Sequence, residues 1–194
     1  MLSWLKQIMR PATSAQTKAL PFDPTLFDQE GASLFKALGI HWGSTNSSIY
    51  MNNASRADAE ALERRYSVRL PKDFRDYLIH AAPKSTFMDE MGTQWWAASE
   101  IKSITDECPN GPPSAFNTEI EREKDVYLVF SDYLIWCYAW AICCSDGPNR
   151  GKIALIGGTP DTFVADSFRD FLRLELTDDN AIHQGAKGQA SVDQ

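Results

Sequence analysis

The part of the chain that most constrains the fold is residues 126–176, where strand-like segments are followed by a helix-like one. The strand-like segments are short and rich in β-branched and aromatic residues. The last segment carries Phe168, Phe171 and Leu172 at the spacing of one helical face. This part of the chain therefore predicts a β layer backed by a helix, with elements at residues 126–130, 134–144, 152–157 and 167–176.

Two helices are expected ahead of this β layer. Ser55, followed three residues later by Asp58, resembles a capping box and predicts a helix start. A second helix should begin at Pro71 and stop at Pro83, with an apolar stripe formed by Phe74, Tyr77, Leu78 and Ala81. Because the connection between the two helices is short, we expect them to lie close together on one face of the sheet.

The other segments are less regular. Asp23 and Pro24 predict a helix start, Gly31 divides that helix into two short pieces, and Gly39 can close it. The further expected elements are a short strand at 48–51, a hairpin near Gly92, a short helix from near Ala98 and an exposed loop over 105–122.

The length of 194 residues predicts a single domain with extensions. Residues 1–22 are interpreted as an N-terminal extension and linker, 23–176 as the domain, and 177–194 as a flexible tail. The apolar run at the N-terminus is too broken for a signal peptide. Residues 1–10 are expected to pack on the domain as a short helix, with a membrane-surface anchor as the alternative. No segment approaches the roughly 20 apolar residues that a membrane span needs.

The net charge of -7 bears on the class of partner. An acidic protein repels nucleic-acid phosphates and anionic lipid heads, so we expect no direct binding to nucleic acid. The same charge attracts a basic protein. Solubility alone is the alternative explanation.

The sequence contains no motif for catalysis or metal binding. His41, His80 and His183 share no metal-ligand spacing, and the four cysteines include no C-x-x-C pair. The cysteines therefore indicate free thiols in a reducing cytoplasm. A nucleophilic pair of His80 and Cys137 is the catalytic alternative. We predict no catalytic residue, no metal and no cofactor.

Alternation along residues 134–144 separates two groups of side chains, because successive strand residues point to opposite faces. One group is small and apolar, which suits close packing of helices, and the other is large and aromatic. The aromatic face is interpreted either as part of a sheet buried on both sides or as a partly open surface that grips a partner. The residues of such a surface are Trp136, Tyr138 and Trp140, extended by Trp95, Trp96 and Tyr133.

An acidic run precedes the first of these strands and one more carboxylate follows it. The run contains Glu119, Glu121, Glu123 and Asp125, and Asp132 lies after the strand. It is interpreted either as a solvated surface or as an acidic rim for a basic partner. In the second interpretation, Glu119, Glu121 and Asp132 are candidate contacts.

Several short motifs, in this order, resemble those of the SUKH superfamily. The first is a helix with a central Glu63, followed by Leu70-Pro71 and an acidic-aromatic helix start at Asp73-Phe74. Trp96 and Ile101 resemble the hydrophobic segment that follows. The second half of the pattern, within a match over residues 48–176, consists of Val129-Phe130-Ser131-Asp132, Gly151-Lys152-Ile153 and Ala165-Asp166-Ser167-Phe168.

The resemblance implies an α+β fold with a mixed, mostly antiparallel sheet and helices packed on one face. It implies a non-catalytic protein that binds another protein. Bacterial members of such families are largely immunity proteins that neutralise a cognate polymorphic or contact-dependent toxin, and fungal members regulate cell-wall synthesis. The partner expected here is therefore a cognate toxin, for example a basic nuclease. The alternative is a regulatory or scaffold module that binds a host protein without a toxin.

Overall fold

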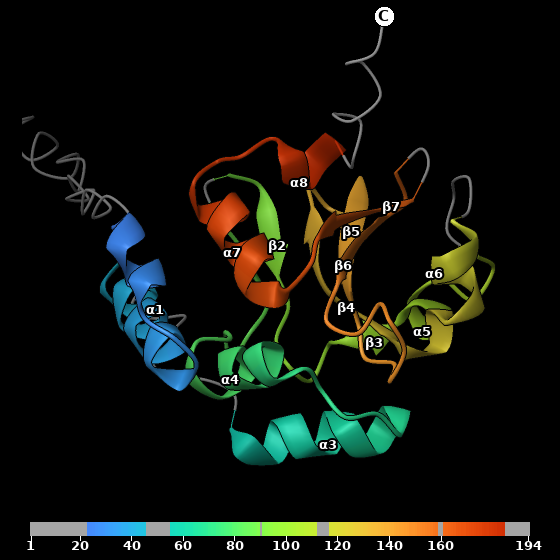
Figure 1. The fold of residues 1–194 in the computed structure, drawn as a ribbon, viewed down its shortest axis with the longest axis horizontal. Coiled ribbons are helices and arrows are strands. Elements are labelled where there is room, and N and C mark those ends of the chain that lie inside the picture. The colour runs from blue at the N-terminus through green and yellow to red at the C-terminus, as the bar shows by residue number, and fades with distance from the viewer. Residues whose placement is uncertain (1–22, 46–54, 90, 112–116, 159–160, 185–194) are drawn as a thin grey trace, which may run out of the picture.

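The computed structural model describes residues 23–45, 55–89, 91–111, 117–158 and 161–184. These residues form an α+β fold with one antiparallel sheet, and the sequence predicts this class (Figure 1). The helices lie on both sides of the sheet (Figure 1), whereas the sequence-based expectation places them on one face. The N-terminal extension and the strand expected at 48–51 lie outside the described residues.

The sheet has seven strands in the order β1-β2-β4-β5-β6-β7, and β3 pairs with β4 beside β2. Every pair among the described strands is antiparallel, so the sheet is more uniform than the mixed one expected. The strands are β1 Phe87–Met88, β2 Thr93–Trp95, β3 Lys102–Ser103, β4 Tyr127–Tyr133, β5 Tyr138–Cys143, β6 Ile153–Ile156 and β7 Thr162–Ala165.

The helices confirm most of the sequence-based starts. Ser55 and Asp58 form a capping box, in which the Asp58 carboxylate accepts the backbone N–H of Ser55 at 2.7 Å. Asp23 caps the first short helix, and Ser167 caps the last long one. The helices are η1 Pro24–Asp28, α1 Ala32–Thr45, α3 Arg56–Tyr66, α4 Lys72–His80, α5 Ile104–Glu107, α6 Thr118–Arg122, η2 Lys124–Val126, α7 Phe168–Leu176 and α8 Ala181–Gln184.

Gly39 does not end a helix, contrary to the sequence-based expectation. Helix α1 continues through it to Thr45. A Cβ atom at position 39 would lie 2.3 Å from the carbonyl oxygen of His80, at the end of α4. Glycine is needed here because α1 and α4 approach each other closely, not because the backbone turns.

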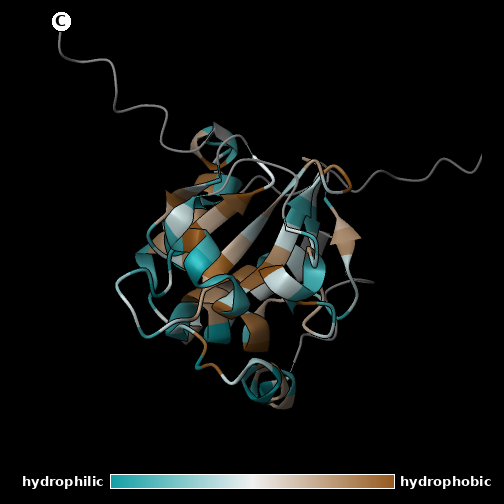
Figure 2. Cartoon of the chain, turned by 90° about the vertical axis from the view of Figure 1, so that its right-hand side faces the viewer, coloured by the Kyte–Doolittle hydropathy of each residue, from teal (hydrophilic) through white to brown (hydrophobic). Residues whose placement is uncertain are grey.

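The sheet is buried on both faces, which confirms one of the two interpretations of the strand at 134–144. Trp140 of β5 faces α7, where its ring lies 5.4 Å from that of Phe171. Cys143, three residues on and therefore on the other face, lies near Glu123 between α6 and η2. Figure 1 accordingly shows α1, α4 and α7 on one side of the central strands and α5 and α6 on the other. Figure 2 shows hydrophobic residues on the central strands and a largely hydrophilic α3 at the bottom.

Three other expectations need correction. The segment near Ala98 is a turn followed by β3, and the helix there begins only at Ile104. The loop expected over 105–122 contains most of α5 and all of α6. Residues 177–184 do not form the flexible tail expected there, because they include α8, which packs on the sheet through Ile182, 1% exposed. A single buried isoleucine in a polar segment is too weak a signal for periodicity to detect.

Candidate functional site

The three tryptophans expected on an open aromatic face are instead part of the interior. Trp95, Trp96 and Trp140 are 2%, 6% and 0% exposed. The Trp140 indole donates to the carbonyl of Ile182 at 3.0 Å, so α8 closes over it. The interpretation of these three side chains as partner contacts is therefore wrong, because a fully packed ring has no surface to offer.

Asp132 is likewise buried, at 0% exposed, and holds three donors. Its carboxylate accepts hydrogen bonds from the indole of Trp96 at 2.7 Å, the amide of Gln94 at 3.0 Å and the backbone N–H of Trp136 at 2.8 Å. Trp136 itself is half-buried, and its indole donates to Glu107 at 2.9 Å. Asp132 therefore joins β2, β4 and the turn after β4, and its role is to position that turn.

Tyr133 and Tyr138 are the expected aromatic residues that reach the surface in part. Their rings stack with centroids 5.0 Å apart across the end of the β4–β5 hairpin. The Tyr138 hydroxyl is hydrogen-bonded to Nδ1 of His183 at 2.7 Å. Burial lowers the pKa of His183, which favours its neutral form.

Glu119 and Glu121 lie apart from these aromatic residues. They belong to α6, next to the start of β4, whereas Tyr133 ends that strand. Glu119 accepts the side-chain amide of Asn149 at 3.1 Å, and Glu121 pairs with Lys124 at 2.6 Å. The structure thus places Glu119 and Glu121 at the opposite end of β4 from the aromatic candidates and from Asp132, and does not combine them into one site.

Four of the five exposed large hydrophobic residues in the described chain lie at the aromatic end of the sheet, in β1 and in two turns that the sequence does not indicate as a site, and the fifth, Ile40, lies on α1. Backbone N–H of Leu134, after β4, donates to the carbonyl of Gly92, before β2, at 3.0 Å. A Cβ atom at Gly92 would lie 2.8 Å from a Leu134 methyl carbon, so the turns are in contact. We call the four exposed side chains here the apolar tip: Met88, Met91, Leu134 and Ile135, at 41%, 53%, 49% and 81% exposed.

The β4–β5 turn has a strained backbone. Leu134, Ile135 and Trp136 have φ angles of 45°, 57° and 68°, which is the left-handed region that favours glycine. Such a conformation costs roughly 1–2 kcal/mol for each residue of this kind. The turn is closed by the bond from the N–H of Cys137 to the carbonyl of Tyr133 at 2.8 Å and is anchored by Asp132.

The strand expected at 134–144 is therefore shorter than predicted, because the turn occupies its first residues and β5 begins only at Tyr138. The segment from Asp132 to Cys137 contains no glycine, proline or asparagine, and its alternation matched a strand. The signal that could have indicated a turn is the length of the alternating run, which exceeds an ordinary strand.

Three carboxyl groups lie beside the apolar tip, and we call them the tip carboxyls: Asp89, Glu175 and Asp178. Asp89 accepts the backbone N–H groups of Met91 and Thr93, both at 3.0 Å, and so shapes the β1–β2 turn. Glu175 is 8% exposed. Burial raises the pKa of Glu175 to about 7, and the charges of Asp89 and Asp178 act in the same direction. Of the three, Asp89 lies within the tip itself, between Met88 and Met91.

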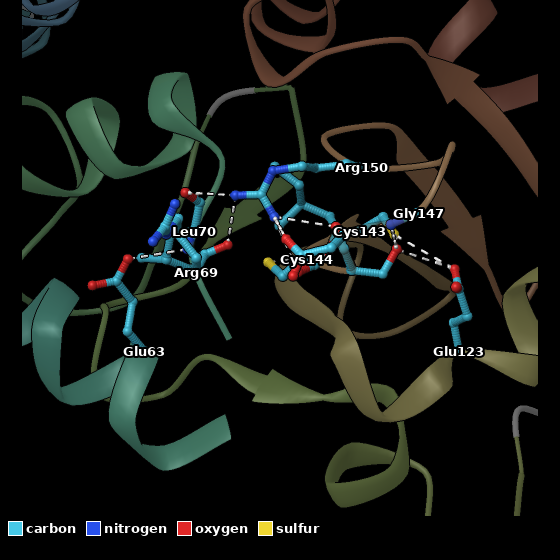
Figure 3. Close-up of polar contacts among 11 residues, drawn as sticks. Glu63, Arg69, Leu70, Glu123, Cys143, Cys144, Gly147 and Arg150 are labelled. Carbon is cyan, nitrogen blue, oxygen red and sulfur yellow. Dashed lines mark hydrogen bonds and ion pairs between the residues drawn. The ribbon is translucent and has the colours of Figure 1, made fainter. Parts of the chain in front are cut away.

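Glu63 and Asp73 of the SUKH-like motifs, and Arg150 beside them, have structural roles. Figure 3 shows the contacts of Glu63 and Arg150. The Glu63 carboxylate accepts the N–H of Leu70 at 3.1 Å, which orders the connection between α3 and α4. Arg150 donates to the carbonyl oxygens of Arg69 at 2.9 Å and Leu70 at 3.3 Å, as well as to that of Cys144 at 3.3 Å. Asp73 accepts the N–H of Arg169 at 3.1 Å and so joins the starts of α4 and α7.

Other places that could hold a ligand are less developed. In the part of the chain that the structure describes, no three His, Cys, Asp or Glu side chains cluster as a metal site would need, and none of the helices there is long and apolar enough to cross a bilayer. An open pocket of about 170 Å³ lies between α3 and the turn after β2. Its polar side chains already have partners, since Asp58 caps α3 and Arg65 pairs with Asp106 at 3.6 Å.

No model of a known protein family and no curated protein sequence matches this chain. The resemblance to the SUKH superfamily therefore stays a prediction from the motifs.

Proposed function

We propose that the protein is a non-catalytic protein-binding module, and specifically a cytoplasmic immunity protein that binds and neutralises a cognate bacterial toxin. The observation that carries the proposal is the apolar tip. Met91, Leu134 and Ile135 lie exposed on two contacting turns, Met88 lies exposed on the adjoining strand β1, and Ile135 is 81% exposed. Gathered apolar residues of this kind mark protein-binding surfaces more often than scattered ones do.

The construction of the tip also supports binding. Two carboxylates order the two turns. Asp132 accepts a hydrogen bond from the backbone N–H of Trp136, and Asp89 accepts one from the backbone N–H of Met91. A surface that is already ordered loses little conformational entropy when a partner covers it. A left-handed hairpin turn formed by leucine, isoleucine and tryptophan, where glycine or asparagine is usual, is a further sign of function.

The toxin as partner is supported by the order of the SUKH-like motifs and by the charge. The net charge of -7 favours association with a basic protein, as many enzymes that act on nucleic acids are. Neutralisation needs no chemistry from this chain, because occlusion of the toxin's active surface is sufficient.

The test is co-expression with the candidate toxin domain encoded beside this gene. We expect the two chains to co-purify and the host cells to survive toxin expression. Survival without a complex, or a complex without survival, would contradict neutralisation by binding. A complex with a host protein and no effect on the toxin would instead favour the regulatory or scaffold alternative.

A further inference from the structure

We infer that the apolar tip is the docking surface for the partner. In the complex, Ile135 enters an apolar recess on the partner, and basic side chains of the partner surround that recess. The inference rests on the proposed function and adds to it the place of contact and the chemistry of the opposing surface. It also replaces the aromatic face, whose tryptophans are buried, as the expected contact.

The first step of the argument is exposure. Ile135 and Leu134 are adjacent in one turn, and Met91 belongs to the turn that contacts it. Removing apolar surface from water is favourable in proportion to its area, so leaving these side chains exposed is unfavourable in the free protein. A partner that covers the tip recovers the free energy of removing it from water. Methionine side chains adapt to irregular apolar surfaces, which suits Met88 and Met91 to the rim of such a contact.

The second step is the shape of the β4–β5 turn. Three successive residues of this turn have the left-handed conformation, which tight hairpin turns usually supply with glycine, asparagine or aspartate. An isoleucine is a poor choice for such a position, because its branched Cβ increases the strain. Asparagine, aspartate or glycine would fit the backbone better. The side chain of Ile135 therefore contributes nothing to the turn, and its contribution must be sought outside the fold.

The third step is charge. Asp89 lies in the β1–β2 turn between Met88 and Met91, where its carboxylate accepts the N–H of Met91 at 3.0 Å, and the whole chain carries a net charge of -7. On the other side of the turn, Glu107 is paired with Lys102 at 2.8 Å, so this pair adds no net charge. The surroundings of the tip are thus apolar and negative. Their complement is an apolar recess with lysine or arginine at its edge.

A membrane or a nucleic acid fits this surface less well than a protein does. Anionic lipid heads and phosphates are repelled by the tip carboxyls. A protein can combine an apolar recess with basic side chains at matched positions, and hot spots of protein interfaces consist of such buried anchors.

The experiment measures binding of the protein encoded by the adjacent gene, used as the candidate partner, to the full-length chain and its variants. In Ile135→Asp the new side chain tolerates the left-handed backbone, so the variant should fold, and its circular dichroism and unfolding midpoint check this. We expect the Kd to rise at least about 30-fold, as for an interface hot spot. The matched control is Ile40→Asp on α1, where the isoleucine is 74% exposed, and its Kd should stay unchanged.

A second pair of variants tests the charge. Asp178→Asn beside the tip should lower the association rate constant roughly threefold at low salt. Asp146→Asn, at the opposite end of β5 and 98% exposed, should leave it unchanged. An equal effect of the two variants would show that net charge alone attracts the partner and would overturn the basic rim.

The outcomes separate the inference from the proposed function. Tight binding by the original chain that Ile135→Asp leaves intact overturns the tip as docking surface and leaves the immunity function standing. No binding by the original chain overturns both. A dimer of the free chain that Ile135→Asp dissociates, detected by sedimentation, would show that a second copy covers the tip and would also overturn the inference.

Discussion

The aromatic interior and the apolar tip lie at the same end of the sheet and use opposite kinds of residue. Beneath α7 and α8, Trp95 and Trp140 are packed to within 2% of full burial. A few residues away, Leu134 and Ile135 are exposed on a strained turn. Tryptophan is among the residue types most enriched in interface hot spots, but here it lies in the interior. The exposed residues are leucine and isoleucine, which usually lie in a core. Side-chain type alone does not tell which surface a protein presents.

The largest expected difference between the two regions is in stability. Trp140→Ala removes a buried ring and its bond to Ile182, and should lower the free energy of unfolding by about 4 kcal/mol. Ile135→Ala, at an exposed position, should change it by less than about 0.5 kcal/mol. Urea unfolding followed by circular dichroism measures both. The loss of unfolding free energy in Trp140→Phe, which keeps a ring, should lie between these two values. Equal losses for Trp140→Ala and Ile135→Ala would contradict the distinction between a packed interior and an exposed tip.

The second prediction concerns the carboxylate that joins the two regions. Asp132→Ala leaves the buried donors of Trp96, Gln94 and Trp136 without their acceptor and should cost about 3 kcal/mol. Hydrogen exchange should also become faster at the N–H of Trp136. Asp125→Ala, which removes an exposed carboxylate before β4, is the control and should cost less than about 1 kcal/mol. A protected Trp136 N–H in the Asp132 variant would contradict the anchoring of the turn.

The third prediction is a dependence of stability on pH. The pKa of Glu175 is raised from 4.5 to about 7 in the folded protein, so the folded state keeps this proton after the unfolded state has released it. The stabilisation by the neutral carboxyl is therefore complete below pH 4.5 and is lost as pH rises through about 7. Glu175→Gln, which stays neutral, should be about 2 kcal/mol more stable than the original chain at pH 8.

The measurement is urea unfolding of both chains from pH 5 to pH 8. The difference between them should shrink as the pH falls, and His183 and His80 contribute equally to both curves. A difference that is constant over this range would show that Glu175 does not titrate in it.

The smallest expected effect concerns strain at the tip. Ile135→Asn places a residue that tolerates the left-handed conformation at a φ of 57° and should raise the free energy of unfolding by about 1 kcal/mol. The same substitution should weaken partner binding, because it removes the apolar anchor. Ile40→Asn on α1 is the control and should not stabilise. A destabilised Ile135→Asn would mean that the isoleucine serves the fold after all.

Local sequence signals predicted much of the fold. The Ser55–Asp58 capping box, the stripe of Phe74, Tyr77 and Leu78, and the Ser167 cap all correspond to observed helices. The strand segments at 126–130 and 152–157 correspond to β4 and β6. These predictions succeeded because capping and apolar periodicity act over a few residues of one element.

The candidate site was less predictable, and the reason is physical. The alternating pattern of residues 134–144 fits one long strand as well as it fits a left-handed turn followed by a shorter strand. The turn contains no glycine, proline or asparagine that would indicate it. β7 and α8 were missed because they are short and stable only in contact with β6 and Trp140. Their existence depends on partners far away in the chain.

The sequence by itself determined the α+β class, the main helices and the alternation of large and small residues along β5, because these follow from local backbone and hydrophobic preferences. Only the tertiary structure decided which of the two faces is covered and which apolar side chains stay outside. That choice is made by α7 and α8 packing over Trp140 and by Asp132 holding the turn at Trp136. Both depend on contacts between distant segments, and such contacts leave no periodic trace in the sequence.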